Sequence, residues 1–222
     1  MRESREAEPW NAPSGGVPVS RRDEIVDAAI AISEEVGVDN LSMRLIGKRM
    51  GTSAMAIYRH VPSREALLDA MVGRVLASVA LPGPEKPWPE RLRVIGHGLL
   101  DAAQANPTVF PMVLTRTYQA DEAIAVMRSM YEVLAEAEVP PDAVPRVERM
   151  VSTALIGYAV AASTDAFWAV DPTLASRELR VPDVRSAGGA PERWHDELDQ
   201  NVDDLVMLVQ SLARKDRRSE DP

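Results

Sequence analysis

The residues with the most distinctive chemistry lie between positions 41 and 64. This window holds no acidic side chain and five basic ones, Arg44, Lys48, Arg49, Arg59 and Arg64. Guanidinium and ammonium groups bind phosphate oxygens, and arginine can also donate two hydrogen bonds to a guanine edge. The chain as a whole carries −9, and residues 81–222 hold 15 basic against 23 acidic side chains. Local charge decides where a polyanion docks, so the window predicts a nucleic-acid contact; the alternative is an ordinary solvated face.

Two short helices around a glycine are expected to position these side chains. The segment from Leu41 to His60 reads LSMRLIGKRMGTSAMAIYRH, and Gly51 can take the positive φ that a sharp turn needs. The inward positions are apolar: Leu45, Ile46, Met50 and Ile57. The outward positions are Arg44, Thr52, Ser53, Met55, Tyr58, Arg59 and His60. This pattern predicts a helix-turn-helix, whose second helix fits the major groove of DNA, although helical hairpins without this function share the spacing.

Helical periodicity continues along the rest of the chain, and no alternating strand pattern of useful length is present. We expect an all-α fold with a disordered tail at 1–19, a helix-turn-helix DNA-binding domain at 20–80 with its motif at 41–60, and a C-terminal domain at 81–222 for ligand binding and dimerisation. Apolar residues repeat at helical spacing near positions 25–36, 64–79, 92–105, 124–134, 147–162 and 198–212. The stretch from Pro172 to Pro191 is rich in proline and glycine, which indicates a loop or a short helix.

Composition removes several other classes of protein. Cysteine is absent and there are three histidines, so no thiolate nucleophile and no metal site are expected. The acidic and histidine residues at 195–197 and 203–204 lack a nucleophile at a meaningful spacing, and no glycine-rich phosphate loop is present, so neither a catalytic site nor a cofactor is expected. The longest run without a polar side chain is far shorter than a membrane span, and no apolar secretory segment begins the chain. A cytoplasmic protein without a membrane contact is the expectation.

The segment from Ser20 to about Val79 resembles the N-terminal domain of the tetracycline repressor (TetR) family of bacterial transcription regulators. The resemblance is carried by Gly37, by LSMR at 41–44, by GTS at 51–53, by IYRHV at 57–61 and by EALL at 65–68. The run Tyr58-Arg59-His60-Val61 further suggests the C-terminal subclass of the tetracycline repressor. The resemblance implies an Ω-shaped homodimer with an N-terminal DNA reader and a C-terminal ligand-binding core.

The resemblance assigns roles to residues of the motif. Arg44 is expected to reach a base edge or a phosphate, and Tyr58 to donate its hydroxyl to a phosphate. His60 and Arg64 are expected on phosphates, and Arg59 on either a base or a phosphate. The remaining predicted DNA-binding residues are Thr52, Ser53, Ala54 and Met55. Ala54 and Met55 can read a thymine methyl but offer few directional hydrogen bonds, so the operator is expected to differ from the tetracycline operator.

The C-terminal half offers candidates for an effector cavity and for a dimer interface. The predicted ligand-binding residues are His97, Leu99, Met112, Met127, Tyr131, Tyr158 and Trp168; for each, a role in the ordinary core is the alternative. Methionine-rich walls suit an apolar effector, whereas residues such as Ala80 and Ile95 argue against tetracycline with magnesium. Helices near 145–163 and 191–213 carry apolar side chains on more than one face, which predicts a four-helix interface through Leu155, Ala159, Leu205 and Val209.

These expectations describe a ligand-responsive regulator, a repressor that binds a palindromic operator of double-stranded DNA as a homodimer and is released by a small hydrophobic effector. Two alternatives stay open: a helical ligand-binding or adaptor protein that does not bind an operator, and a helical-bundle enzyme.

Overall fold

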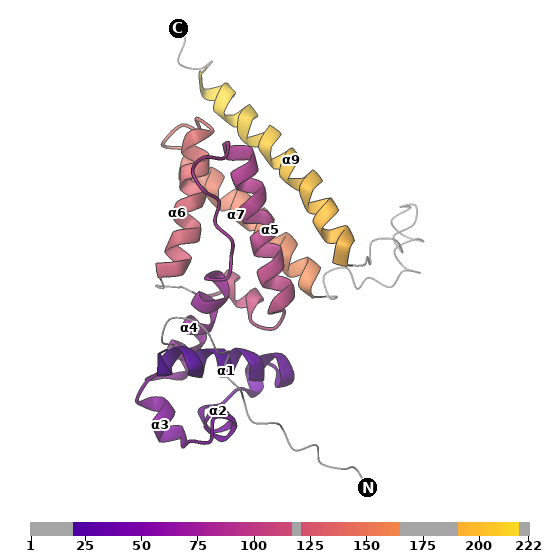
Figure 1. The fold of residues 1–222 in the computed structure, drawn as a ribbon. Coiled ribbons are helices and arrows are strands. Elements are labelled where there is room, and N and C mark those ends of the chain that lie inside the picture. The colour runs from indigo at the N-terminus through magenta and orange to yellow at the C-terminus, as the bar shows by residue number, and fades with distance from the viewer. Residues whose placement is uncertain (1–19, 117–120, 165–190, 218–222) are drawn as a thin grey trace.

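The computed structural model describes residues 20–116, 121–164 and 191–217, and these ranges contain helices and no strand. The lower group in Figure 1, called the head below, comprises α1 (Arg21–Val36), α2 (Met43–Arg49), α3 (Ala54–Tyr58) and α4 (Arg64–Leu76). The upper group, called the body, comprises α5 (Trp88–Ala105), α6 (Asp121–Glu136), α7 (Val144–Ser163) and α9 (Pro191–Arg217). Short 3-10 turns lie at Val38–Asn40 and Phe110–Leu114. The predicted all-α fold is confirmed.

The head is held together by local capping and by a small apolar core. Ser20 caps α1: its hydroxyl accepts a hydrogen bond from the backbone N–H of Asp23, whose carboxylate accepts one from the backbone N–H of Ser20. Ile32, Ile46 and Ile57 bring α1, α2 and α3 together with at most 1% of each side chain exposed. The buried side chains of α4 complete this core. Burial of this kind fixes the angle between α2 and α3.

Contacts at α4 and α1 connect the head to the body. Helix α4 packs against α1 in the head and against α6 in the body. The guanidinium of Arg116 donates to Asp69 on α4 at 2.7 Å, and the backbone N–H of Thr108 donates to the carboxylate of Glu34 on α1 at 3.1 Å. The orientation of the head therefore depends on groups that belong to the body.

Helix α5 lies at the centre of the body and packs against α6, α7 and α9 (Figure 1). Its inward face is apolar and buried, and comprises Leu92, Ile95, Leu99, Leu100, Ala102 and Ala103. None of the helices in the described ranges is long and apolar enough to cross a membrane.

Two helices of the body begin before the apolar repeats from which they were predicted. Helix α5 starts at Trp88 rather than near Leu92, because Pro89 falls in the first turn, where its missing N–H costs nothing. Helix α9 starts at Pro191, ahead of the repeat that begins at Leu198. The expectations for residues 1–19 and for most of the stretch from Pro172 lie outside the described residues.

Candidate nucleic-acid interface

The unit of α2, its turn and α3 contains two glycines and two serine caps, one at the start of each helix. The hydroxyl of Ser42 accepts from the N–H of Leu45, and that of Ser53 from the N–H of Ala56, both at 3.2 Å. Gly51 has a φ of +64°, which an L side chain rarely adopts. A Cβ on Gly47 would lie 2.9 Å from the carbonyl oxygen of Thr52, so α2 approaches the turn as closely as only glycine allows. The chain thus presents α3 at one defined angle to α2.

The basic residues of the window fall into two groups by their partners. Arg49 makes two hydrogen bonds to the Glu35 carboxylate, at 2.9 and 2.5 Å, and this bonding lowers the pKa of Glu35. Arg64 donates to the carbonyl oxygen of Val38 at 2.9 Å. In contrast, the structure gives no partner within its described residues to the exposed cations Arg44, Lys48 and Arg59. These three cations stay available for the phosphates of a bound polyanion.

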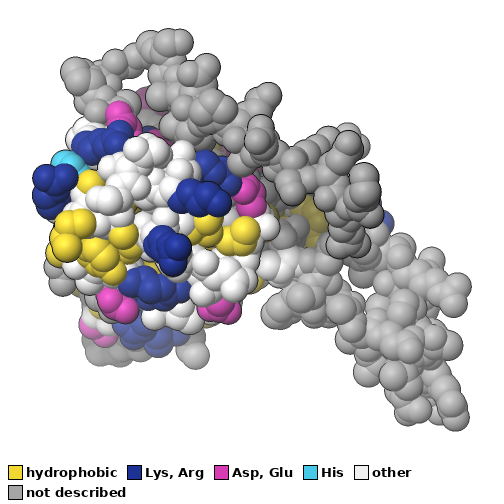
Figure 2. Space-filling view, turned by 90° about the horizontal axis from the view of Figure 1, so that it is seen from below, with side chains coloured by type: hydrophobic (Ala, Val, Ile, Leu, Met, Phe, Trp, Pro, Cys, Tyr) yellow, Lys and Arg dark blue, Asp and Glu magenta, His cyan; other side chains and the backbone are white. Residues whose placement is uncertain are grey.

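Helix α3 exposes apolar and polar groups next to these cations. Met55 is 74% exposed and Tyr58 is 47% exposed, although Ile57 between them is buried. His60 is also exposed, just beyond the end of α3. In Figure 2, which views the molecule from the head end, Lys and Arg side chains spread over the middle of the face and acidic ones lie toward its rim. Such a face would gain burial and charge neutralisation in a DNA groove.

The structure brings the predicted DNA-binding residues together on one end of the head. Ser53 is exposed beside α3, and Thr52 and Ala54 are half-buried in the turn and first turn of the helix. The hydrogen bond of Arg64 to Val38 fixes that side chain against the head, so it has a structural partner that sequence reasoning did not anticipate. Lys48 was missed as a candidate, although its place in the acid-free window and one turn after Arg44 was the signal that could have identified it.

The comparisons with known proteins agree with this geometry. The family model for "Bacterial regulatory proteins, tetR family" matches residues 25–71, which include α2 and α3. An HTH-type transcriptional regulator of Saccharopolyspora erythraea is 26% identical over 210 residues, 88% of this chain and 87% of the relative. Residues 25–71 of the chain therefore match the DNA-binding segment of the TetR family.

Two further similar proteins differ in how much of this chain they match. The HTH-type transcriptional repressor DrrR1 of Streptomyces coeruleorubidus is 41% identical over 61 residues, 28% of this chain and 23% of DrrR1. The alignment thus spans less than a quarter of that repressor's length. ActR of Streptomyces coelicolor, solved without a ligand, has a TM-score of 0.71 at 19% identity over 90% of this chain and 99% of ActR. ActR has also been solved in complex with actinorhodin. The likeness to ActR shows that the two proteins share one fold, which extends through the body.

The predicted ligand-binding residues do not share one surface in the body. Leu99 is buried and Met112 half-buried, whereas Met127 is 45% and Tyr131 is 37% exposed on α6. The buried positions of α6 are Met130, Val133 and Leu134, and the place of Met127 and Tyr131 in a cavity stays a prediction. Trp168 lies outside the described residues.

The two remaining ligand-binding candidates have hydrogen-bond partners within the chain. The Tyr158 hydroxyl donates to the carbonyl oxygen of Trp194 at 2.8 Å, and burial raises the pKa of Tyr158. His97 contacts His195 and Asp199 on α9. Both candidates therefore connect α5 or α7 to α9.

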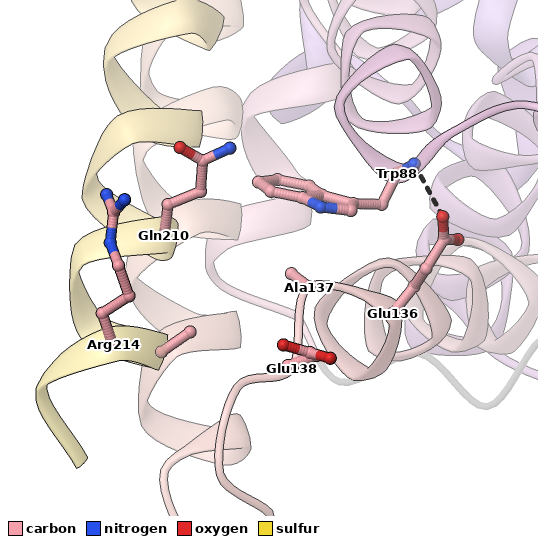
Figure 3. Close-up of a pocket in the computed structure, with 7 residues that line it drawn as sticks. Trp88, Glu136, Ala137, Glu138, Gln210 and Arg214 are labelled. Atoms are coloured by element: carbon pink, nitrogen blue, oxygen red, sulfur yellow. Dashed lines mark hydrogen bonds between the residues drawn. The ribbon is translucent and has the colours of Figure 1, made fainter. Parts of the chain in front are cut away.

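Two hollows in the described body could accept a molecule. One, of about 270 Å³, lies between α7 and α9 and is lined mainly by apolar groups: Ala154, Leu155, Tyr158, Leu198, Asn201, Asp204, Leu205 and Leu208. The other, of about 230 Å³, lies where the Trp88 indole points toward Gln210 of α9, with Glu136 hydrogen-bonded to the Trp88 N–H at 3.0 Å (Figure 3). None of the predicted ligand-binding residues lines this second hollow; Tyr158 alone among them lines the first.

The predicted dimer-interface residues mostly face the interior of their own chain. Leu155, Ala159 and Val209 are buried within the single chain, and Leu205 is half-buried. Leu155 lines the apolar hollow between α7 and α9, so its place in an interface stays a prediction. The assignment of Ala159 and Val209 to a dimer interface is corrected, because side chains without exposed surface have none to offer a partner. On α9 the exposed apolar positions are instead Met207 and Leu208.

Proposed function

We propose that this chain is a ligand-responsive transcriptional repressor of the TetR family that binds a palindromic operator as a homodimer and leaves it when a small hydrophobic effector binds. The observation that carries the proposal is the face of the head on which Arg44, Lys48 and Arg59 have no partner in the described chain, beside the exposed side chains of α3.

The proposed contacts of the head with DNA fall into two sets, those to phosphates and those to bases. Lys48, Arg59, His60 and the Tyr58 hydroxyl contact phosphates, which fix the register of the head without reading sequence. Within the groove, Ala54 and Met55 meet the thymine methyl, and Arg44 reaches a base edge or a phosphate. Arg64 keeps its bond to Val38 and contributes a positive field and a second phosphate contact through its remaining N–H groups.

The proposed dimer is formed by α7 and α9. Both helices border the apolar hollow that includes Ala154 and Leu208, and Met207 is 59% exposed on α9. A second copy on this face would bury these groups in a symmetric interface. The division of the chain at about residue 80, between the DNA-binding head and the ligand-binding and dimerisation body, belongs to the same proposal.

The proposed effector is small and hydrophobic, and binds in the body. ActR, which has the same fold, is a protein whose complex with actinorhodin has been solved. In this chain Met112 and Tyr158 are half-buried and offer apolar and aromatic surface on the turn at Phe110–Leu114 and on α7. An effector that binds better when the head is displaced would shift the dimer away from its DNA-bound form by differential affinity alone.

The test is selection of fragments of the source genome on the purified full chain, followed by footprinting and light scattering of the complex. The expected result is a protected palindrome whose half-site centres lie about 34–36 Å apart, bound by two copies of the chain. If selected fragments bind no better than random DNA at physiological salt, the repressor proposal fails and the chain is a ligand-binding or adaptor protein.

A further inference from the structure

Two of the three histidines of the chain meet between α5 and α9. The Nδ1 atoms of His97 and His195 lie 2.9 Å apart, and the two rings are inclined by only 7°. Their centroids are 5.2 Å apart, which is the separation of two coplanar rings that point their Nδ1 atoms directly at each other. The rings therefore lie edge to edge, in the geometry of a straight N–H···N hydrogen bond.

Each outer nitrogen of the pair faces a carboxylate. The Nε2 atom of His97 lies 2.8 Å from an oxygen of Asp199 on α9, and the Nε2 atom of His195 lies 3.4 Å from an oxygen of Asp101 on α5. Arg93 of α5 holds Asp199 at 2.8 Å and Asp203 at 2.6 Å. The hydrogen bond from His97, followed by that from Arg93, lowers the pKa of Asp199, so this carboxylate is an acceptor. The array crosses from α5 to α9 and back.

The number of protons that this array needs follows from its contacts. The Nε2 of His97 must carry a proton to donate to Asp199, and an ion pair of His195 with Asp101 needs a proton on the Nε2 of His195. The Nδ1···Nδ1 contact must hold one proton, not two. Three protons on four ring nitrogens make one imidazole neutral and the other an imidazolium. The pair then carries one positive charge between two carboxylates, and all three contacts form together in this protonation state alone.

We propose that His97 and His195 share one extra proton and form a proton-dependent clasp that fastens α9 to α5. A metal ion is a poorer occupant than a proton, because each Nδ1 lone pair points at the other nitrogen and a metal at about 2.0–2.1 Å from both would lie far off both lone pairs. Within the described residues there is also no group of three or more His, Asp or Glu side chains that could hold a metal.

The clasp weakens when the pH moves in either direction. Uptake of a second proton on acidification places two N–H groups against each other across 2.9 Å, so the contact between the histidines breaks. Loss of the shared proton at higher pH leaves two N–H groups for three contacts, and the longest one, from His195 to Asp101, is expected to open. The charged groups around the pair are Arg93 and Asp101 on α5 and Asp199 and Asp203 on α9. From α7, the Tyr158 hydroxyl bonds the backbone at Trp194 and stays protonated throughout this range.

The test is a pH titration of the imidazole ¹⁵N and ¹H signals of the full chain by NMR. Groups that interact this strongly titrate in two macroscopic steps, so the signals of His97 and His195 should follow the same two steps, more than about one pH unit apart. His60 is exposed on the head, away from the pair, and its signals supply an internal reference. Independent single steps at His97 and His195 would overturn the proposal.

Variants test whether the two titration steps of His97 depend on His195 and Asp101. His195→Gln should convert the His97 curve to a single step, and Asp101→Asn should shift the upper step of the pair to lower pH because it removes one carboxylate that stabilises the shared proton. The matched control is His60→Gln, which should leave both curves unchanged. Because the wild-type titration needs no variant to fold, the proposal can be tested even if His195→Gln is unstable. A His97 curve that is unchanged in folded His195→Gln would contradict it.

Discussion

The exposed face of α2 and α3 in the head and the start of α5 in the body use arginine in opposite ways. In the body, Arg91 is 5% exposed and lies between the carboxylates of Glu132 and Glu136, and Arg93 lies between two aspartates. In the head, Arg49 forms an ion pair with Glu35, whereas Arg44, Lys48 and Arg59 have no carboxylate partner in the described chain. The comparison teaches that the placement of counter-charges defines the polyanion-binding face, and that the net charge of −9 does not.

The largest effect is expected inside the body. Val209→Glu should destabilise the fold by more than about 4 kcal/mol, because Val209 has no exposed surface and the carboxylate would be buried without a partner. The neighbouring Leu208→Glu should keep the chain folded, since Leu208 is 41% exposed, and should yield monomers that lose operator binding. Urea unfolding separates the first variant from the second, and light scattering detects the monomers. A Val209→Glu variant that stays folded and dimeric would contradict the assignment of Val209 to the buried face of α9.

The next effect should appear in DNA affinity alone. Arg44→Ala should cost about 1–3 kcal/mol of operator binding if Arg44 reads a base, and Lys48→Ala should reduce the salt slope by about one. The matched control is Lys86→Ala in the body, where Lys86 pairs with Glu90 at 3.5 Å and binding should not change. Fluorescence anisotropy over a salt series measures both quantities. Equal losses of operator affinity in the two head variants and in Lys86→Ala would contradict the assignment of DNA binding to the head.

A third effect concerns how the head holds α3. Gly47→Ala should destabilise the chain by about 1–3 kcal/mol, because its Cβ would meet backbone atoms of the turn that cannot move independently. Gly51→Ala should cost about 1 kcal/mol for its positive φ, since nothing lies within 4 Å of the added Cβ. The control in the body is Gly157→Ala in α7, which has open space and should stabilise by about 1 kcal/mol. Chemical unfolding of the three variants should reproduce this order.

The smallest effect should sharpen the contrast between paired and unpaired cations. Glu35→Gln removes the partner of Arg49, and should raise affinity for random DNA by a few-fold at low salt while affinity in high salt stays unchanged. Because Arg49 lowers the folded-state pKa of Glu35, the pair stabilises the fold above the unfolded-state pKa and loses this contribution as the pH falls through the folded-state value. Unfolding measured between pH 3 and 6 should therefore be slightly less pH-dependent in the variant. An unchanged affinity for random DNA would mean that Arg49 lies away from the DNA.

The head could be predicted from sequence because its signals are local. Ser42 and Ser53 cap helices a few residues away, and Gly51 determines its own turn. The face assignments in the body were less successful, because periodicity locates an apolar stripe without saying whether it meets the core or a partner. Val209 followed helical spacing and was assigned to a dimer face, yet it is buried within its own chain. The contact of His97 with His195 spans 98 positions, so no local pattern could indicate it.

The most direct test of the central claim, that the face of α2 and α3 binds DNA, compares exposed methionines of the two regions. In protein labelled with ¹³C at the methionine methyls, Met55 on α3 and Met127 on α6 are 74% and 45% exposed. When the dimer is saturated with a selected operator fragment, the Met55 methyl should shift and show nuclear Overhauser contacts to DNA protons, while Met127 shows no such contact. A saturated complex in which Met55 has no contact to DNA, or in which Met127 has one, would contradict the account.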